Sequence, residues 1–425
     1  MPFRIALSGL NSASDELRVV GNNIANASTN GFKKSRAEFA DIYPATNLGT
    51  ATNAIGSGVK VANIAQQFTQ GNVSFTDNNL DLAISGQGFF RLNDGGTYVY
   101  TRAGAFGVDD DGYVVNSSSQ RLTAYQADSN GNITGALDDL QLDTSDISPN
   151  ASTLVTGVAN LNANADIISA TFDRTDPTTY NNSTSLTVYD ALGNPVVATT
   201  YFKKSAANTW KMHTWLSYTD SAGTTTNTEV LPTGLTAGNG ATLTFSSSTG
   251  ALSSVSPAVG TSTSRIDLQA VSPGTGAANM SFDVELSGTT QFGSGFSVSS
   301  LTQDGYTSGR LSGINIGTTG VVQARYTNGQ TRTLGQVALA NFSNPQGLQQ
   351  LGTTSWADTS ASGAALVGAP GSASLGLVQS GALEGSNVDL TEQLVNMITA
   401  QRNFQANAQV ITTADNITQT IINIR

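Results

Sequence analysis

The strongest constraint on this chain is a heptad spacing of apolar residues at both of its ends. Near the amino end, small and apolar side chains recur at alternating intervals of three and four residues, at Phe3, Ala6, Leu10, Ala13, Leu17, Val20, Ile24 and Ala27. Near the carboxyl end, the same intervals connect Leu390, Leu394, Met397, Gln401, Phe404, Ala408 and Ile411. The pattern then slips by one residue and continues at Ala414, Ile417, Ile421 and Ile424. This spacing is typical of coiled-coil helices, so both ends are predicted to be helical.

Local signals mark where these helices begin and end. Pro2 suits a first helical turn, and Asn30-Gly31 is a strong stop signal. At the other end, Asp389 with Glu392 fits a capping pattern, and so does Ser386 with Asp389. We therefore predict one helix over about 1–28 and a second from Asp389 to the last residue.

The second predicted helix is polar without being charged. Between Gln393 and Ile424 only Arg402 and Asp415 carry charge. A solvated single helix usually carries interspersed charge pairs, whereas uncharged polar faces suit a helix that neighbours cover on several sides. Two interpretations stay open here: an intramolecular coiled coil of the two ends, or a bundle shared among many copies. Both interpretations predict that the two ends pair.

The long middle of the chain, from about Phe39 to Ser380, has the pattern of antiparallel strands. Short β-type runs alternate with turn dipeptides such as Asp94-Gly95 and Asn328-Gly329. The clearest hairpin joins residues 185–189 to residues 196–201 through a turn at 190–195. The predicted fold class is therefore mixed: a coiled-coil pair of terminal α-helices with nested all-β domains of sandwich or barrel type.

Composition excludes several classes of protein. The net charge of −11 leaves no basic footprint for nucleic acid, and the 12% of charged residues is about half of the usual share. The absence of Cys removes disulfides, thiolate metal sites and a Cys nucleophile. No apolar run approaches the roughly 20 residues that cross a membrane, and the amino end lacks the apolar core of a signal peptide. By these rules alone we expect a cytoplasmic protein without membrane insertion.

A search for chemical motifs finds no phosphate-binding loop, dinucleotide fingerprint, zinc motif or nucleophile elbow. The single histidine, His213, lies in an alternating run that predicts a strand. Asp109-Asp110-Asp111-Gly112 lacks the spacing of a calcium loop and is predicted to be a solvated turn. We therefore expect no enzymatic activity, no catalytic residues, no metal site and no cofactor.

Two further motifs, one at each end, carry a resemblance. The first comprises Ala6 to Asn11, Gly21 to Asn26 and Thr29 to Lys33, and includes Asn22, Asn23, Gly31 and Phe32. The second comprises Leu383 to Leu390 and Gln401 to Ala408, and includes Asn387, Asp389, Arg402 and Asn407. Together these motifs resemble the bacterial flagellar rod and hook axial family. Chain length and central runs such as Leu334 to Phe342 are similar to its hook-type members.

The resemblance implies a division of the chain into nested parts. Residues 1–30 with 381–425 would form the terminal helical domain that lines an inner tube. Residues 31–71 with 357–380 would be linkers, 72–148 with 305–356 an inner β domain, and 149–304 a variable outer β domain. The two heptad stripes would then be assembly seams between helices, and the motif residues above would belong to the same inner tube.

The resemblance also implies partners and a location. The subunit would be a structural part that polymerises with many copies of itself into a curved hollow tube, a flexible universal joint that passes motor torque to the filament. Its neighbours would be the flagellar rod below and the hook–filament junction protein above. A hook cap and the flagellar type III export apparatus would act during assembly, so the chain would reach the cell exterior without a cleaved signal peptide.

Two alternatives remain at this point. A distal rod-type axial protein of the same family is the closer one, although such proteins are usually much shorter. An extracellular carbohydrate- or protein-binding β module with helical ends is the remote one. A polymerisation assay read by electron microscopy separates them, since only a hook-type subunit gives thick curved tubes.

Overall fold

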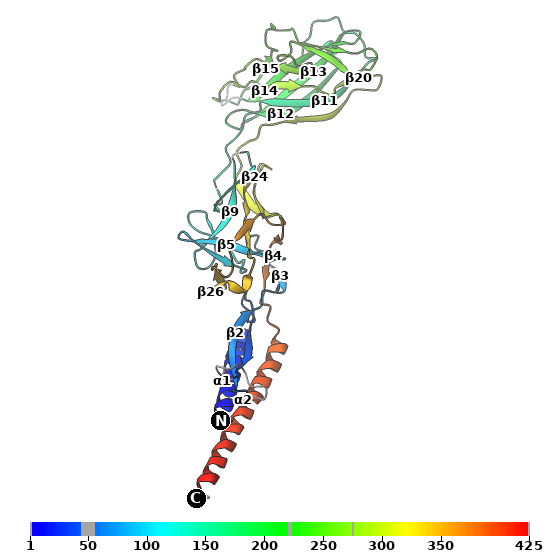
Figure 1. Cartoon of the computed structure of the whole chain (residues 1–425). Helices are drawn as coiled ribbons and strands as arrows, with labels where there is room; N and C mark the ends of the chain where they lie inside the picture. The colour runs from blue at the N-terminus through cyan, green and yellow to red at the C-terminus, as the bar shows by residue number, and fades with distance from the viewer. Residues whose placement is uncertain are drawn as a thin grey trace. The chain divides into compact units, whose positions relative to one another are not determined.

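The computed structural model describes residues 2–43, 56–128, 130–143, 145–219, 223–273 and 276–423. The chain divides into two compact units, both drawn in Figure 1. The terminal unit consists of Met1–Thr144, Ser312–Arg325 and Thr331–Arg425. The insert unit consists of Ser145–Leu311 and Tyr326–Gln330, and so contains the whole of the predicted outer domain. This two-way division does not test the finer predicted boundaries, which stay predictions.

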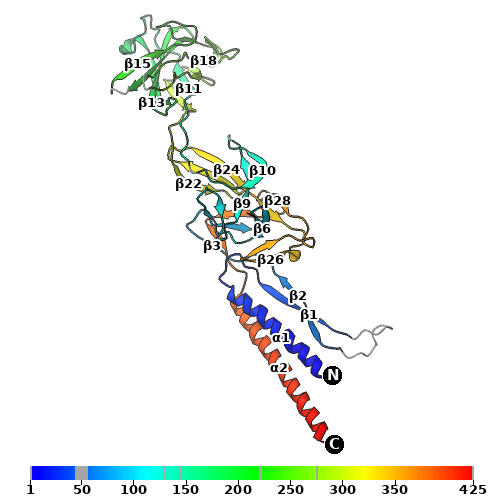
Figure 2. The same ribbon diagram turned by 90° about the vertical axis from the view of Figure 1, so that its left-hand side faces the viewer.

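Two helices lie at the ends of the chain, as predicted. Helix α1 spans Pro2–Ala25 and helix α2 spans Leu390–Asn423. They run side by side in both views, with the two chain ends on the same side, so the pair is antiparallel (Figures 1 and 2). The predicted pairing of the two ends is therefore confirmed. Helix α1 ends earlier than predicted because residues 26–31 form turns, in which the Asn26 amide donates back to the Asn22 carbonyl.

Short two-stranded sheets also belong to the terminal unit, and two of them pair a segment near the amino end with a segment near the carboxyl end. Strands β1 (Ser35–Asp41) and β2 (Val59–Gln66) form an antiparallel pair. Strand β3 (Val73–Phe75) pairs with β30 (Ala382–Glu384), and β4 (Leu82–Ser85) pairs with β29 (Leu377–Ser380). The predicted linkers 31–71 and 357–380 contain several of these strands in their described parts, and their role as linkers stays a prediction.

A 13-stranded sheet makes up most of the remaining terminal unit. Its main path runs β22-β23-β24-β9-β5-β6-β27-β26, with β7, β8, β10, β25 and β28 at its sides. It encloses an apolar core that includes Leu82, Phe90 and Leu122. The strands are β5 (Phe89–Asp94), β6 (Thr97–Thr101), β7 (Gly107–Val108), β8 (Val114–Val115), β9 (Arg121–Ala127), β10 (Ile133–Asp139), β22 (Leu311–Ile316), β23 (Val321–Tyr326), β24 (Thr331–Val337), β25 (Leu339–Asn341), β26 (Gln349–Gly352), β27 (Ser355–Ala357) and β28 (Leu366–Gly368), with a 3-10 turn at Pro345–Gly347.

The insert unit is a two-sheet structure around one core. One sheet has the order β18-β19-β11-β20 with β21 beside β11, and the other has the order β12-β13-β14-β16-β17 with β15 beside β14. Val284 of the first sheet and Trp210 of the second belong to the same buried cluster, which confirms the predicted all-β domain. The strands are β11 (Leu154–Asn162), β12 (Asn182–Tyr189), β13 (Pro195–Ala206), β14 (Thr209–Thr219), β15 (Thr225–Val230), β16 (Ala241–Phe245), β17 (Leu252–Ser256), β18 (Arg265–Asp267), β19 (Asp283–Glu285), β20 (Thr290–Phe292) and β21 (Ser297–Gln303), with a 3-10 turn at Pro177–Thr179. The predicted hairpin is found as β12–β13.

Candidate functional site

The contact between α1 and α2 is built from small side chains. Ala6, Ala13 and Val20 are the buried apolar residues of α1, and Ala400 is fully buried on α2. At Gly9 the two helices lie close together, since a Cβ there would lie 2.5 Å from the side-chain oxygen of Asn407. Small residues let two helix backbones approach, so this pair is held by close packing along its length.

The register of the pair leaves the end of α2 without a partner helix. Asn23 hydrogen-bonds Gln393 at 3.0 Å, and Gly9 faces Asn407. In the same antiparallel register, Pro2 falls opposite Ala414, yet α2 continues to Asn423. The apolar side chains on this extension are in water: Ile417 is 55% exposed and Ile422 is 66% exposed.

A second uncovered apolar surface lies on the side of α2 away from α1. Leu394, Val395 and Ile398 are 48%, 57% and 50% exposed, and we call these three residues the outer α2 patch. Residues three and four apart share one helix face, which places the three side chains together. The patch lies well away around the helix from Ala400, which faces α1.

The start of α2 is fixed by side chains. Asp389 Oδ1 accepts from the backbone N–H groups of Thr391 (2.8 Å) and Glu392 (3.1 Å), which is the predicted N-cap. The Glu392 carboxylate does not complete a capping box but pairs with Lys34 Nζ at 2.9 Å. The Ser386 hydroxyl accepts from the N–H of Val388 in the preceding turn.

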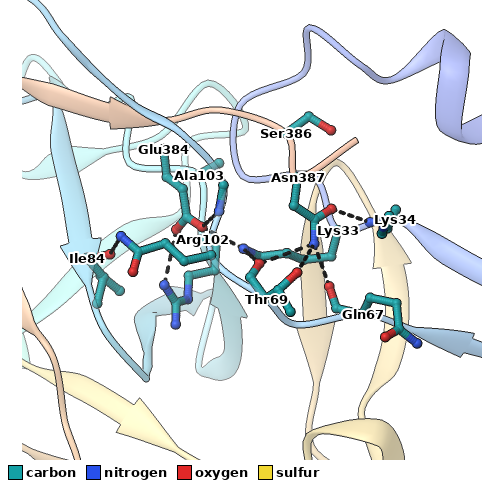
Figure 3. Close-up of polar contacts among 12 residues, drawn as sticks. Lys33, Lys34, Gln67, Thr69, Ile84, Arg102, Ala103, Glu384, Ser386 and Asn387 are labelled. Carbon is teal, nitrogen blue, oxygen red and sulfur yellow. Dashed lines mark hydrogen bonds and ion pairs between the residues drawn. The ribbon is translucent and has the colours of Figure 1, made fainter. Parts of the chain in front are cut away.

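Two asparagines connect the helix pair to strand β1 and the segment beside it. Asn23 is buried, accepts from the N–H of Ser35 at 2.9 Å and donates to its carbonyl at 2.8 Å, as a neighbouring strand would. Asn387 accepts from the N–H of Lys34 at 2.7 Å and donates to the carbonyl of Gln67, also at 2.7 Å. Figure 3 shows Asn387 between these partners. Both amides thus hold chain segments that are distant in sequence.

Beside these amides lies a buried charge cluster of Lys33, Arg102 and Glu384 (Figure 3). Lys33 Nζ is 2.6 Å from Glu384 Oε1, and Arg102 Nη1 is 3.1 Å from Glu384 Oε2. The side chains of Lys33 and Glu384 are fully buried. The N–H of Gly71 also donates to Glu384 Oε1 at 2.8 Å. The Glu384 carboxylate therefore connects Lys33 of the amino-terminal motif, Gly71 and Arg102, which follows strand β6 of the large sheet.

The cluster contains two cations and one anion, and all three side chains are buried. Burial is the main cause that lowers the pKa of Lys33, and the nearby Glu384 carboxylate opposes this effect. Burial likewise lowers the pKa of Arg102, against the same carboxylate. Backbone carbonyls stabilise the cations further, since Lys33 donates to Thr69 and Arg102 donates to Gly86, each at 2.8 Å. The whole arrangement depends on Glu384, because it is the one anion of the cluster.

We call the region around Asn23, Asn387 and the buried charge cluster the junction. Close backbone contacts explain two of its glycines. Gly31 has φ of +71°, and a Cβ there would lie 2.4 Å from the backbone nitrogen of Ala103. At Gly71 a Cβ would lie 2.1 Å from the carbonyl oxygen of Gly385. Any larger residue would push these segments apart, so both positions require glycine.

Comparison with known families matches four regions of the chain. The matching models are "Flagella basal body rod protein" over residues 3–33, "Flagellar hook protein FlgE/F/G D1 domain" over 83–157, "Flagellar basal body protein FlaE D2 domain" over 160–306 and "Flagellar basal body rod FlgEFG protein C-terminal" over 379–424. Both motif-bearing ends lie within matched regions.

Relatives of full length decide the family. The chain is 38% identical to the flagellar hook protein FlgE of Salmonella typhimurium over 437 aligned residues, which cover 100% of both chains. It is also 38% identical to the FlgE of Escherichia coli, again over 100% of both chains. The FlgE of Borreliella burgdorferi is 34% identical over 99% of this chain and 98% of its own. The chain belongs to the flagellar hook protein family.

A solved structure of a flagellar hook protein supports the fold. The Helicobacter pylori flagellar hook protein FlgE2 matches with a TM-score of 0.52 at 13% identity, over 72% of this chain and 99% of that one. At such low identity the likeness concerns the fold alone. The resemblance drawn from the two end motifs is confirmed by the family models and the full-length relatives.

The predicted amino-terminal seam of this flagellar hook family member lies largely on the buried side of α1. Ala6, Ala13 and Val20 are buried, whereas Phe3 is 52% exposed. The remaining seam positions are half-buried: Leu10, Leu17, Ile24 and Ala27. Phe3 is uncovered because it lies at the free end of α1. Whether these residues act in assembly stays a prediction.

The predicted carboxyl-terminal seam is only partly the face that meets α1. Met397, Phe404, Ala408 and Ile411 are half-buried, but Leu390, Leu394 and Ile417 are exposed. These three positions are not covered by α1, and their role in an assembly seam stays a prediction. The contact instead uses Gln393 and Ala400, which are buried. The side chain of Ile421 and all of Ile424 lie outside the described residues.

The family-motif residues lie in several separate places. Asn23, Gly31, Phe32 and Asn387 meet at the junction, and Asp389 caps α2. Asn22, in the last turn of α1, and Asn26, just after that helix, bond one another with 2.8 Å between their side chains. Asn407 lies in the α1 contact, while Gln401 and Arg402 are exposed on α2. The motif residues therefore do not form one site.

The two places considered above for chemical roles, His213 and the turn at Asp109, are held by ring packing and by local hydrogen bonds. His213 lies within strand β14, as predicted, stacked on Phe172 with 4.0 Å between ring centroids. Asp109 Oδ1 accepts from the N–H groups of Asp111 and Tyr113 in its own turn, as expected of a solvated turn. Among the described residues, no group of three metal-ligating side chains occurs, and no helix has the length and apolar character to cross a membrane.

Sequence reasoning missed the buried charge cluster. Lys33 was visible only as part of a short basic run, and Glu384 only as part of the second motif. The available signal was a charged residue within each otherwise apolar or glycine-containing stretch, Gly31-Phe32-Lys33 and Leu383-Glu384-Gly385. Arg102 carried no such signal.

Proposed function

We propose that this chain is the repeating structural subunit of the bacterial flagellar hook, with a structural and not an enzymatic role. Many copies would polymerise into a curved hollow tube that passes motor torque to the filament as a flexible universal joint. The observation that carries this proposal is the set of apolar side chains that the α1–α2 contact leaves in water.

The uncovered apolar surfaces support packing among copies. The outer α2 patch and the α2 extension present apolar side chains on a helix that is otherwise polar and almost uncharged. Burying one such side chain contributes about 1.5–3 kcal/mol, so several per subunit supply a large driving force. A second copy offers the same apolar surfaces, and repeated packing of like helices then produces a tube. Phe3, Leu390 and Ile417 have this role in the proposal.

The junction supports the passage of force through each subunit. Glu384, Asn23 and Asn387 tie the helix pair to β1, to residues 67–71 and to the large sheet by buried hydrogen bonds and ion pairs. A load applied to the helices is therefore transmitted to the strands through several connections at once. We propose that this junction keeps each subunit stiff in its inner part.

The proposal includes a location and partners. The subunit acts in the flagellum at the cell exterior, with the flagellar rod below and the hook–filament junction protein above. A hook cap and the type III export apparatus act during assembly, and the chain passes out unfolded, without a cleaved signal peptide. A chain that contains no Cys suits such export, since no disulfide forms before passage.

Leu394→Asp tests the proposal at the outer α2 patch. Leu394 is exposed in the single chain, so the variant should fold as a monomer. In a polymer the new carboxylate would be buried without a partner, which costs several kcal/mol and should abolish tube formation. Purified protein is assayed for polymerisation by electron microscopy and light scattering.

Leu192→Asp is the matched control. Leu192 is likewise exposed, at 58% against 48% for Leu394, but it lies in a turn of the insert unit, which does not contain the helices. It should polymerise at close to the normal rate. Normal tubes from Leu394→Asp, with monomer stability unchanged, would refute the role of the helices in assembly.

A further inference from the structure

Helix α2 carries one cation and one anion after its first turn. Between Gln393 and Ile424 these two charges are Arg402 and Asp415, and the other side chains are uncharged. Both are exposed in the single chain. Neither forms an ion pair within the described residues, and Asp415 accepts a hydrogen bond from Gln419 of its own helix at 3.3 Å. Each charge can therefore meet a partner outside the chain.

Arg402 belongs to the face of α2 that points away from α1. It follows Val395 by seven residues and Ile398 by four, and these spacings place side chains on one face of a helix. Arg402 thus extends the outer α2 patch by one turn toward the carboxyl end. A second helix that covers the outer α2 patch would therefore cover the Arg402 guanidinium as well.

Asp415 lies on the α2 extension, at the point where the partner helix is missing. Pro2 falls opposite Ala414 in the register of the helix pair, so α1 begins just short of Asp415. Ile422 follows Asp415 by seven residues, shares its face and is 66% exposed, and the half-buried Ile411 precedes it by four. The extension therefore presents a carboxylate among apolar side chains, which is the complement of the outer α2 patch with its guanidinium.

The two charges point to different sides of α2. Arg402 and Asp415 are 13 residues apart, so at about 100° per residue their directions differ by about 140° around the helix axis. One neighbouring helix does not reach both sides, and a two-helix dimer that pairs each cation with the other anion does not fit. Each copy instead uses Arg402 toward one neighbour and Asp415 toward another. A contact between two different surfaces repeats from copy to copy.

We propose that Arg402 of one copy pairs with Asp415 of a second copy packed beside it, and that this ion pair sets the register between neighbouring α2 helices. The inference rests on the proposed assembly role and specifies one of its contacts. Because the copies in a tube are parallel, the pairing shifts neighbouring α2 helices by 13 residues, or about 20 Å at 1.5 Å per residue. The same shift brings Ile398 of one copy beside Ile411 of the next, so the apolar and charged contacts agree. Ion pairs between packed helices select register and partner in this way.

Charge reversal at each position tests the pairing in the full chain. Arg402→Glu brings two anions together in the polymer, and Asp415→Lys brings two cations together. Both positions are exposed, so each variant should keep the helix content of the parent monomer by circular dichroism. Each variant alone should raise the critical concentration for polymerisation, measured by light scattering and electron microscopy, at least about tenfold. An equimolar mixture of the two should polymerise near the parent concentration, since the introduced Glu of one chain then meets the introduced Lys of the other.

Arg325→Glu is the matched control. It reverses an exposed cation of strand β23, outside the helices, and should leave the critical concentration within about twofold of the parent value. The parent tubes give a second readout by electron cryomicroscopy, in which neighbouring α2 helices should be offset by about 20 Å along the tube.

The outcomes separate this inference from the assembly role on which it rests. If the parent chain forms tubes and either reversal leaves the critical concentration unchanged, the ion pair is overturned and the assembly role stands. A mixture of the two reversed chains that stays monomeric also overturns the pairing, and so does an offset that holds the two side chains apart. A parent chain that forms no tubes contradicts the assembly role itself, and the ion pair with it.

Discussion

At the scale of single residues, Glu384 is the side chain on which the junction depends. Replacing it by Gln keeps its shape but leaves the buried cations Lys33 and Arg102 without an anion. We expect Glu384→Gln to lower the free energy of unfolding of the terminal unit by about 3–5 kcal/mol, measured by urea denaturation.

A matched Glu→Gln control exists in the same region. Glu392 pairs with Lys34 at 2.9 Å, but its side chain is 53% exposed. Exposed pairs contribute about 0–1 kcal/mol, so Glu392→Gln should have little effect on stability. Similar losses from the two variants would contradict the importance given to burial.

His213 should make the insert unit sensitive to mild acid. Burial lowers its pKa below the usual 6.5; Glu229, at 3.3 Å, opposes this effect, while Lys203 and Lys211 add to it. Below pH 6.5 the unfolded chain therefore binds a proton more readily than the folded chain, and stability falls as the pH falls. We expect the melting temperature of the insert unit to drop between about pH 7 and pH 5.

His213→Gln provides the comparison for this prediction. The variant has no group that titrates at this position, so its melting temperature should change less over the same pH window. An equal drop in the variant and the parent chain would show that other groups cause the pH dependence.

At the scale of elements, the close α1–α2 contact can be tested with two glycines of α1. Ala is a better helix former than Gly by about 1 kcal/mol, so Gly21→Ala, with no atom within 4 Å of the new Cβ, should stabilise α1. Gly9→Ala should lose this gain, because the new Cβ meets the Asn407 side chain, whose amide is bonded to the Asn403 carbonyl. Hydrogen exchange of α1 amides measures both effects, and equal protection in the two variants would refute the close approach at Gly9.

The same helix pair shows how far sequence patterns lead. The heptad spacing predicts both helices and their pairing correctly, since periodicity is a local property. It does not by itself identify the side of α2 that meets α1, because α2 carries apolar side chains on several sides. The pair forms on Ala400 and Gln393, where small or hydrogen-bonding side chains allow close contact, and leaves the larger Leu390 and Leu394 in water.

The junction could not be predicted for a different reason. Lys33 and Glu384 are 351 residues apart, and their pairing follows from the strands that bring residues 31–33, 69–71 and 382–384 together. No local rule reports such a contact. The β hairpin of residues 185–189 and 196–201, by contrast, was predictable because its turn and alternation lie within one short stretch.

At the scale of the whole molecule, the insert unit can be removed by design. The two chain segments that lead into and out of it are bridged at Ile147–Gly309 and at Asn150–Tyr306. Replacing residues 148–308 by Asn-Gly should therefore close the chain as a tight hairpin. We expect this variant to polymerise through its helices and to form tubes of altered curvature in electron micrographs. The reason is that we expect contacts between the insert units of neighbouring copies to contribute to curvature, and the variant lacks these contacts.

Two outcomes would contradict this prediction. Tubes with unchanged bend and supercoil would show that the insert unit does not contribute to curvature. A folded variant that forms no tubes would show that the helices alone do not drive assembly. The same deletion carrying Leu394→Asp serves as the negative control for polymerisation.

The buried charge cluster has a last consequence, for chain completeness. Lys33 and Arg102 lie in the first quarter of the sequence, whereas their shared anion lies at position 384. A product that stops before this position keeps both cations and lacks the carboxylate that neutralises them when they are buried. We therefore expect only a chain that extends past Glu384 to bury Lys33 and Arg102, so the two ends of the sequence should become ordered together.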